Sequence, residues 1–565
     1  MTACQVCRAR RTKCDNLKPS CSFCLKTGAH CIQSTVDLSS FDPASLQILS
    51  RLDDLESLLR QSPEKSTEDP SSVVSRSKVT IGETHDRPAS ILPPRATDIL
   101  EWPNFRRILS GEHSTPDVTR DVATLDNWAD GSRAVEVLEL TPSPILLENF
   151  WENVHVKNPI LDEVRIRDLR NKIALHGFDQ SGDSCLLLLL CALGSITKAF
   201  KVDQSVSPRS ACFLNAKTYF RAAQQCIGTL MMQGGLRAAQ CLFFSGVSMA
   251  TVFDKWAAWR YFSQSLACCQ QFISSAKHTA VSSGDLTSDR QAVYWSAWKS
   301  EVEMRNLIDA SDFPLPDHLT YPSFFPTPPA PTGTDPLRVD VRINARQNTS
   351  WFFYLSEISM RRLSTRISQD LLALYGKPVE DIEFVIPQST GDWEEEIEQW
   401  VASLDESVSL SGDPSDDDIC KWILRGQLLN LYEQIYWPPL FQIICGNRHQ
   451  GSPITLDDLY HFGNKALVIH DQRLRTNRPG MSHRHHGTMF MIETCARSAL
   501  LLLCVALLKL QASDEVARLH LPDTWLEGVR CVHDMIIYWQ SEYPETGSWA
   551  QAIRVGLELW NSRLL

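Results

Sequence analysis

The chain has 565 residues, of which 43% are hydrophobic and 22% are charged. It is therefore long enough for more than one folded domain and too apolar for a disordered protein. The net charge of −12 is unevenly divided: the first 31 residues carry six Lys or Arg against one Asp, or +5, which leaves −17 on the other 534. This division excludes a uniformly basic polyanion-binding protein and indicates that only the N-terminal head meets a polyanion.

The head contains six cysteines in the pattern C-x₂-C-x₆-C-x₆-C-x₂-C-x₆-C, which consists of two nearly identical halves. Clustered thiolates with C-x₂-C pairs are typical ligands of tetrahedral Zn²⁺. Six thiolates can hold one zinc and leave two ligands unused, or two zincs if two sulfurs bridge, and the repeated half favours two. The candidate zinc ligands are Cys4, Cys7, Cys14, Cys21, Cys24 and Cys31.

Two other interpretations of these cysteines are less consistent with the sequence. A disulfide-bonded secreted module needs an export signal, and the three residues before Cys4 are too few for one. We therefore expect a reducing compartment, in which disulfides do not persist. An iron–sulfur site suits the paired, symmetric halves poorly.

The cysteine spacing, the basic run from Arg8 to Lys13, Asp15 and Pro19 resemble the fungal Zn₂Cys₆ binuclear zinc-cluster transcription factor family. The resemblance implies that Cys4 and Cys21 bridge two zinc ions. It further implies that Cys7 and Cys14 complete one zinc site, and Cys24 and Cys31 the other. It also implies a nuclear, sequence-specific transcription factor of RNA polymerase II genes, which regulates a fungal metabolic or secondary-metabolite biosynthetic pathway.

The basic residues of the head are the candidate DNA contacts. Arginine can bond guanine O6 and N7 together, and phosphate contacts supply affinity that falls with salt. The family resemblance places Arg10 and Arg11 where a basic pair reads a CGG-type triplet in double-stranded DNA. We assign phosphate contacts to Arg8, Lys13, Lys18 and Lys26. The alternative is a solvated basic face. The same basic run can also serve as a nuclear import signal.

Residues 32–61 read as a linker followed by a short coiled-coil helix. Residues 32–42 are polar, and Asp42-Pro43 is typical of a helix start. An a/d seam of about two heptads follows, formed by Ile48, Leu52, Leu55 and Leu59. We predict a homodimer through residues 43–61, and the alternative is an amphipathic helix that docks on the rest of the chain.

Residues 62–135 read as a largely disordered linker, because Ser, Pro, Glu and Lys dominate residues 62–95. Within it, Trp102, Phe105 and Trp128 suggest partial packing. Residues 136–565 read as a large all-α regulatory domain, subdivided near 322–345 by a proline-rich stretch. The first part, roughly 140–330, resembles the fungal middle homology region in its helical pattern: Ile145–His155, Cys185–Leu193, Ala216–Ala223, Ala257–Phe262 and Arg290–Leu307. Further helices are predicted at Trp351–Leu374, Asp392–Leu404, Ile419–Cys445, Leu456–Thr476, Gly487–Leu510 and Trp525–Tyr543.

Three features of the body contain residue types that are common in functional sites. Acidic residues are interleaved with apolar ones in 392–418, a composition typical of an activation segment. The spacing of Trp393, Ile397 and Trp400 is equally that of an ordinary amphipathic helix, which we favour. The histidines of 483–486 favour a solvated loop over a metal site. His155, on an apolar helix, is expected to be a hydrogen-bonded core histidine.

The chain contains none of the nucleotide-binding or catalytic motifs that we sought, so we predict that it is not an enzyme. No apolar run reaches the length of a membrane span, and the longest runs, near 186–191 and 499–508, read as buried helices. Partners are therefore DNA, the transcription machinery and, as a hypothesis that no residue marks, a small-molecule effector. The alternative is a helical ligand-binding protein or enzyme whose zinc head is a structural or protein-docking module.

Overall fold

The computed structural model divides into two units, Met1–Arg87 and Pro88–Leu565, which we describe separately. The structure describes residues 4, 6–7, 12–15, 17–28 and 31 of the first unit. Of the second unit it describes 92–109, 140–201, 206–278, 287–308, 325–328, 341–375, 379–445, 456–511 and 516–564. The predicted coiled coil of 43–61 lies outside the described residues, and so do Arg8, Arg10, Arg11 and nearly all of the predicted linkers. In the described part of the first unit, residues 6–7 are helical and α2 (Ser22–Thr27) is a short helix.

The described part of the second unit is built from helices, without a strand, which confirms the predicted all-α fold class. Helix propensity alone does not explain these helices, because most bury an apolar stripe against a neighbour. In chain order they are α4 (Ala96–Leu100), α5 (Pro103–Leu109), α6 (Pro144–Asn153), α7 (Glu163–His176), α8 (Gly182–Ile196), α9 (Ala211–Gln233), α10 (Gly235–Thr251), α11 (Lys255–His278), α12 (Ser288–Ile308), α13 (Val341–Tyr375), α14 (Val379–Ala402), α15 (Ile419–Cys445), α16 (Leu456–Asn477), α17 (Thr488–Leu510), α18 (Trp525–Trp539) and α19 (Gly547–Leu564).

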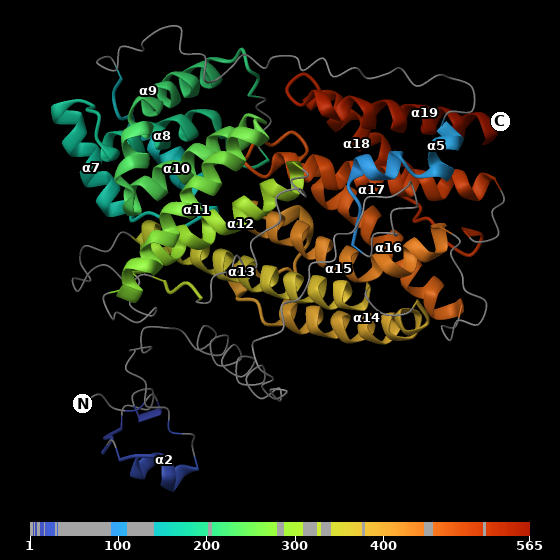
Figure 1. The fold of residues 1–565 in the computed structure, drawn as a ribbon, viewed down its shortest axis with the longest axis horizontal. Coiled ribbons are helices and arrows are strands. Elements are labelled where there is room, and N and C mark those ends of the chain that lie inside the picture. The colour runs from blue at the N-terminus through green and yellow to red at the C-terminus, as the bar shows by residue number, and fades with distance from the viewer. Residues whose placement is uncertain are drawn as a thin grey trace, which may run out of the picture. The chain divides into compact units, whose positions relative to one another are not determined.

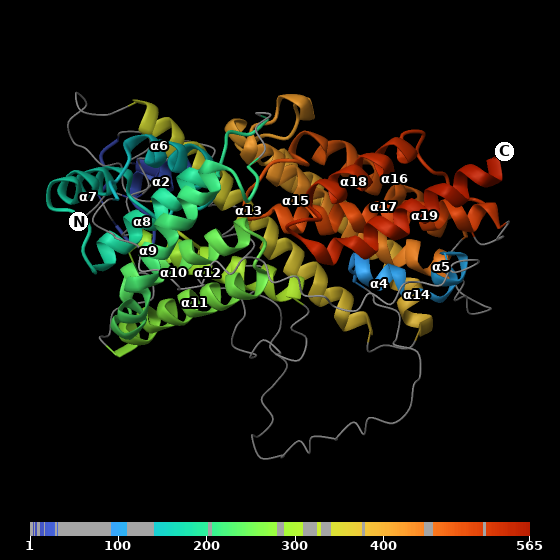
Figure 2. The ribbon, with the colours of Figure 1, turned by 90° about the horizontal axis from the view of Figure 1, so that it is seen from above.

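The helical body has two halves that lie side by side. Helices α6–α12 gather at one end and α15–α19 at the other, as Figures 1 and 2 show from two directions. The 35-residue helix α13 contacts both the short 3₁₀ helix η2 (His155–Lys157) of the first half and α15 of the second. It therefore joins the two halves along one side.

Each half is organised around one very apolar helix. In α8, residues 184–196 are all buried, and in α17 the run 498–508 is buried as well. This confirms that the two longest apolar runs are buried helices. Contrary to the prediction that no apolar run reaches the length of a membrane span, helix α17 is long and apolar enough to cross a membrane, but 83% of its most apolar window is buried inside the protein.

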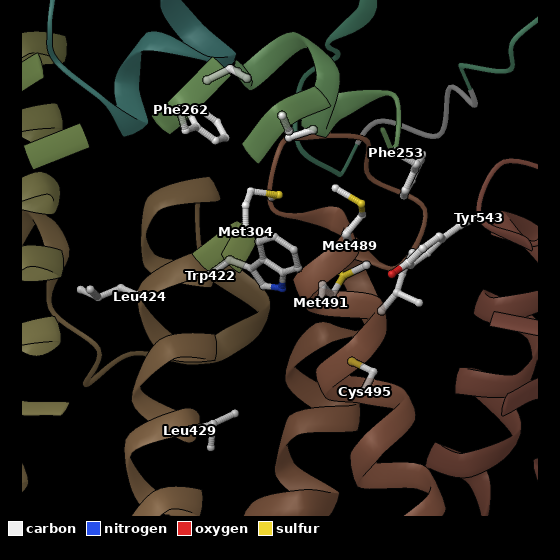
Figure 3. Close-up of a cluster of buried hydrophobic side chains, with 14 of the residues drawn as sticks. Phe253, Phe262, Met304, Trp422, Leu424, Leu429, Met489, Met491, Cys495 and Tyr543 are labelled. Carbon is white, nitrogen blue, oxygen red and sulfur yellow. The ribbon is translucent and has the colours of Figure 1, made fainter. Parts of the chain in front are cut away.

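The junction between the halves contains a cluster of methionine and aromatic side chains. Met304 of α12, Trp422 of α15, and Met489 and Met491 of α17 lie near one another there (Figure 3). All four are buried. Methionine adapts its shape to irregular gaps, so this junction depends less on one fixed packing than an interface of branched side chains would.

Residues 92–109 form part of the helical body, although the sequence assigned them to the linker of 62–135. Ala96 and Phe105 are fully buried, and the Ala96 N–H donates to Glu493 Oε1 of α17 at 2.8 Å. Trp102 stacks on Trp437 with ring centroids 6.0 Å apart. The partial packing that Trp102 and Phe105 suggested is therefore found, and the body begins earlier than its predicted start at residue 136.

Candidate metal centre and nucleic-acid interface

The local structure of the head is set by Cys21, which begins α2. Its backbone is extended, and its sulfur accepts a hydrogen bond from the Cys24 N–H at 3.5 Å. Gly28 ends the helix with φ of 68°, a left-handed conformation that favours glycine, and its N–H donates to the Cys24 carbonyl. The C-x₂-C pair therefore lies at a helix start, where both sulfurs point to the same side.

Asp15 supports the same helix start from the preceding loop. The Ser22 N–H, which has no partner within the helix, donates to Asp15 Oδ1 at 3.0 Å. Hydrogen bonds from the Ser22 side chain and backbone lower the pKa of Asp15. The charged carboxylate thus links the first half of the head to the helix of the second.

The two halves of the head repeat a local arrangement. The Cys4 N–H donates to Cys14 Sγ at 3.4 Å, and the Cys21 N–H donates to Cys31 Sγ at 3.3 Å. Both bonds span ten residues. The two halves that repeat in the sequence therefore also form equivalent N–H to sulfur hydrogen bonds.

The six sulfurs form two groups of four that share Cys4 and Cys21. One group adds Cys7 and Cys14, the other adds Cys24 and Cys31, and the sulfurs within each group lie within 4.8 Å of one another. The Cys4 and Cys21 sulfurs are 3.6 Å apart, too far for a disulfide bond of about 2.05 Å. None of these six cysteines is in a disulfide bond.

This geometry fits zinc. Four sulfurs placed tetrahedrally about 2.3 Å from one Zn²⁺ lie about 3.8 Å from each other. The sulfur–sulfur distances agree: Cys7 to Cys21 is 3.6 Å in the first group, and Cys4 to Cys24 is 3.7 Å in the second. The donor set is all thiolate, which suits a soft, closed, structural site with no open position for a substrate.

The protonation of these thiols differs within the cluster. Burial raises the pKa of Cys4, and burial together with the neighbouring Cys21 raises the pKa of Cys24 to about 12. The backbone N–H of Cys24 instead lowers the pKa of Cys21 to about 6. Cys21 is therefore the most acidic of these three, and metal binding has to displace protons from the others.

The basic residues of the head that the structure describes are exposed. Lys13, Lys18 and Lys26 all lie on the surface, with Lys26 in the last turn of α2. The peptide bond between Lys18 and Pro19 is cis. No ion pair joins these lysines to a carboxylate among the described residues, so their charges face solvent and are available to phosphates.

In the body, the histidine loop differs from our prediction. We expected a solvated loop at 483–486, but Arg484 and His485 are each only 4% exposed. Arg484 forms a buried ion pair with Glu542 at 2.6 Å and donates to the Val206 carbonyl at 2.7 Å. The loop thus connects the two halves of the body, which a sequence rich in His and Arg did not indicate.

Two other body predictions are confirmed. His155 is a hydrogen-bonded core histidine, since its Nε2 accepts from the Leu161 N–H at 3.2 Å. The acidic stretch begins as the amphipathic end of α14, where Trp393 and Ile397 are buried and Trp400 Nε1–H donates to Ser359 at 2.8 Å.

Comparison with known proteins agrees with this geometry. Residues 2–39 match the fungal Zn(2)-Cys(6) binuclear cluster domain. Over 504 residues the chain is 25% identical to a protein of Aspergillus rugulosus named "Putative transcription factor ecdB", which covers 81% of this chain and 82% of that protein. The similarity therefore extends through the helical body and is not confined to the cysteine cluster.

Proposed function

We propose that this chain, a zinc-cluster transcription factor of the fungal Zn(2)-Cys(6) type that holds two zinc ions, reads a CGG-type triplet in double-stranded DNA. Arg10 and Arg11 are the base-reading residues of this proposal. Lys13, Lys18 and Lys26 contact phosphates together with Arg8. The exposed positions of the three lysines support this role.

The observation that carries the proposal is the pair of sulfur groups that share Cys4 and Cys21. We assign Cys4 and Cys21 as bridging ligands, with Cys7 and Cys14 on one zinc and Cys24 and Cys31 on the other. The metal ions supply a rigid cross-link to a segment too short to form a hydrophobic core, and the chain's own part is to present its basic side chains from that frame.

We further propose the division of labour along the chain. Residues 1–31 bind DNA, 32–61 dimerise, and the helical body receives a small-molecule signal and passes it to the transcription machinery. The protein acts in the nucleus on RNA polymerase II genes of a fungal metabolic or secondary-metabolite pathway, by binding and not by catalysis. The acidic body and basic head support this arrangement, because only the head attracts DNA.

The test is binding of the full chain to fluorescent duplexes with and without a CGG triplet, at several salt concentrations. Arg11→Ala should remove the preference for the triplet while zinc content stays at two ions. Lys26→Ala is the matched control. It should weaken binding to all duplexes about equally, and it should reduce the slope of log affinity against log salt concentration by about one. Undiminished triplet preference in Arg11→Ala would refute the assignment, and no DNA binding at any salt would favour a zinc head that only docks proteins.

A further inference from the structure

A pocket of about 660 Å³ lies in the first half of the body, between α6, the end of α8 and the start of α9. Figure 2 shows these three helices next to one another. Its volume is in the range of pockets that hold small organic molecules. Ile145 and Leu146 of α6 and Ala211 of α9 form an apolar part of its wall, and Ile145 is 79% exposed. The described chain thus leaves apolar surface exposed at this pocket.

A lysine and a cysteine in the wall of the pocket are in direct contact. Lys198, two residues after the end of α8, donates to Cys212 Sγ at 3.5 Å. Both side chains are partly exposed. Cys212 is the second residue of the long helix α9, so it lies among N–H groups that have no partner within the helix. A neighbouring ammonium and a helix N-terminus both favour the thiolate, which is the nucleophilic form of cysteine.

The ammonium of Lys198 has donors to spare for a ligand. An ammonium group carries three N–H donors, and Cys212 is the partner that Lys198 has among the described residues. The carboxylates in the same wall are bound elsewhere, since Glu148 pairs with Arg346 at 2.9 Å and Glu152 pairs with Arg342. An acceptor that enters the pocket can therefore take a hydrogen bond from Lys198 without breaking an ion pair.

The same wall connects the pocket with the helix that joins the two halves of the body. Arg342 and Arg346, which bind the wall carboxylates, belong to α13. α13 contacts η2 of the first half and α15 of the second. A molecule that fills the pocket and displaces α6 would therefore act on α13, and the position of the pocket suits the proposed receiver of a small-molecule signal.

Other cysteines of the body differ from Cys212. Cys185 and Cys191 of α8 are fully buried, so a reagent in solvent does not reach them. Cys268 of α11 is partly exposed, but burial raises its pKa, and no cation contacts its sulfur in the part of the chain that the structure describes. Cys268 is therefore a matched reference for a thiol that is accessible without a neighbouring ammonium.

We propose that this pocket captures small α,β-unsaturated carbonyl compounds through a covalent bond to Cys212. The Cys212 sulfur bonds to the β-carbon, the carbon–carbon double bond becomes a single bond, and the thiol proton ends on the α-carbon. The addition is complete in itself and needs no oxidant or second reactant. Lys198 donates to the carbonyl oxygen, where negative charge develops, and the apolar wall takes the rest of the molecule.

The inference rests on the proposed role of the body as receiver of a small-molecule signal, and it names the ligand class and the site. It does not depend on triplet reading or on the pairing of two chains. Its test contains no DNA and follows one chemical bond in the body. Failure of the test would therefore leave the proposed DNA contacts of the head untouched, and loss of those contacts would leave the test valid.

The experiment treats the zinc-loaded full chain with 4-phenyl-3-buten-2-one and follows the adduct by mass spectrometry of tryptic peptides. Peptide 210–217, with Cys212, should gain the probe about tenfold faster than peptide 261–277, with Cys268, because one hydrogen bond to a charged group is worth about this factor. The saturated ketone 4-phenyl-2-butanone fits the same pocket but cannot form the bond, so its excess should slow the reaction of Cys212 alone. No adduct at Cys212, equal rates at both cysteines, or no competition would overturn the proposal.

Two matched lysine variants test the contact between Lys198 and the sulfur. Lys198→Gln should slow the addition at Cys212 about tenfold, because glutamine keeps a polar side chain but removes the ammonium. Lys172→Gln, on the exposed surface of α7, should leave the rate unchanged. An equal rate in wild type and Lys198→Gln, or an equal loss in both variants, would refute the role of the lysine–cysteine pair.

Discussion

Among single residues, the six cysteines of the head are not equivalent. Cys4 and Cys21 belong to both groups of four sulfurs, whereas Cys31 belongs to one. In the proposed ligand assignment, a shared sulfur serves both metal ions, so its loss affects both sites at once. The loss of an unshared sulfur leaves the other site with all four ligands.

Zinc content therefore tests the assignment directly. We expect Cys21→Ala to lose both zinc ions, because each site would keep only three thiolates and no bridge. Cys31→Ala, the matched control, should keep about one zinc per chain. The measurement is metal analysis of purified protein after dialysis against a weak chelator, and one tightly held zinc in Cys21→Ala would argue against bridging.

His155 makes the stability of the body dependent on pH. Burial, and then the charge of Arg346, lower the pKa of His155 to about 3 from an ordinary value near 6.5. Between these values the unfolded chain binds a proton that the folded protein excludes. The contribution of neutral, buried His155 to the stability of the folded protein is therefore fully present above pH 6.5 and is lost as the pH falls below 6.5.

Replacing His155 by Gln should reduce this acid sensitivity. Glutamine offers an oxygen that can accept the Leu161 N–H, yet it does not titrate. Between pH 7.5 and 5.5 the variant should lose about 1 kcal/mol less stability than the wild type. Urea unfolding at the two pH values measures this difference, and equal losses in both proteins would contradict the assigned shift.

Among the elements, the contact of α6 with α8 depends on a glycine. A Cβ on Gly194 would lie 2.0 Å from the Leu146 carbonyl oxygen, which is backbone and cannot move aside easily. Asn149 of α6 donates to the Gly194 and Thr197 carbonyls at the end of α8. The two helices therefore approach more closely than any side chain at position 194 permits.

We expect Gly194→Ala to destabilise the body by about 2 kcal/mol, because α6 must shift away from α8. Gly228→Ala in α9 is the matched control, since its Cβ would meet no atom within 4 Å on an exposed helix surface. That change should be neutral or stabilising by about 0.5 kcal/mol. Chemical denaturation of both variants measures the contrast, and similar effects of the two would contradict the close contact.

The sequence predicted the elements best where their apolar pattern is long. α15 begins at Ile419 and ends at Cys445 as predicted, although Pro438 and Pro439 lie inside it. α13 begins at Val341, ten residues before its predicted start at Trp351, because residues 341–350 are polar enough to resemble a loop. The sequence did not predict α19, Gly547–Leu564, because Pro544 and Gly547 are typical of a turn and not of a helix start.

The elements that pattern reasoning missed are stabilised by distant residues. α4 has only five residues, too few to be stable alone, and its first N–H is bound by Glu493, 397 residues later in the chain. His485 likewise looks like part of a solvated loop until its neighbours are known. The zinc cluster differs from these elements, because its ligands are close together in the sequence and their spacing alone predicts the site.

At the scale of the whole molecule, the chain separates opposite charges. The basic head of +5 and the remaining −17 belong to one polypeptide, so DNA attracts one part and repels the rest. A single small head that contacts one triplet has few phosphate contacts and limited affinity. The predicted pairing of two chains through 43–61 would add the second head that such a protein needs.

Dimerisation can be tested by placing charge on the predicted seam. Changing both Leu52 and Leu55 to Glu should give a monomer in sedimentation experiments, because buried like charges oppose pairing. The same two charges placed off the seam, at Ser50 and Ser57, should leave the dimer intact. On DNA with two triplets the seam variant should bind about 100-fold more weakly than the wild type, while both bind a single triplet equally, because linked heads gain from effective concentration. Equal affinities on two-triplet DNA would mean that the heads act singly and that the 43–61 helix serves to dock on the rest of the chain.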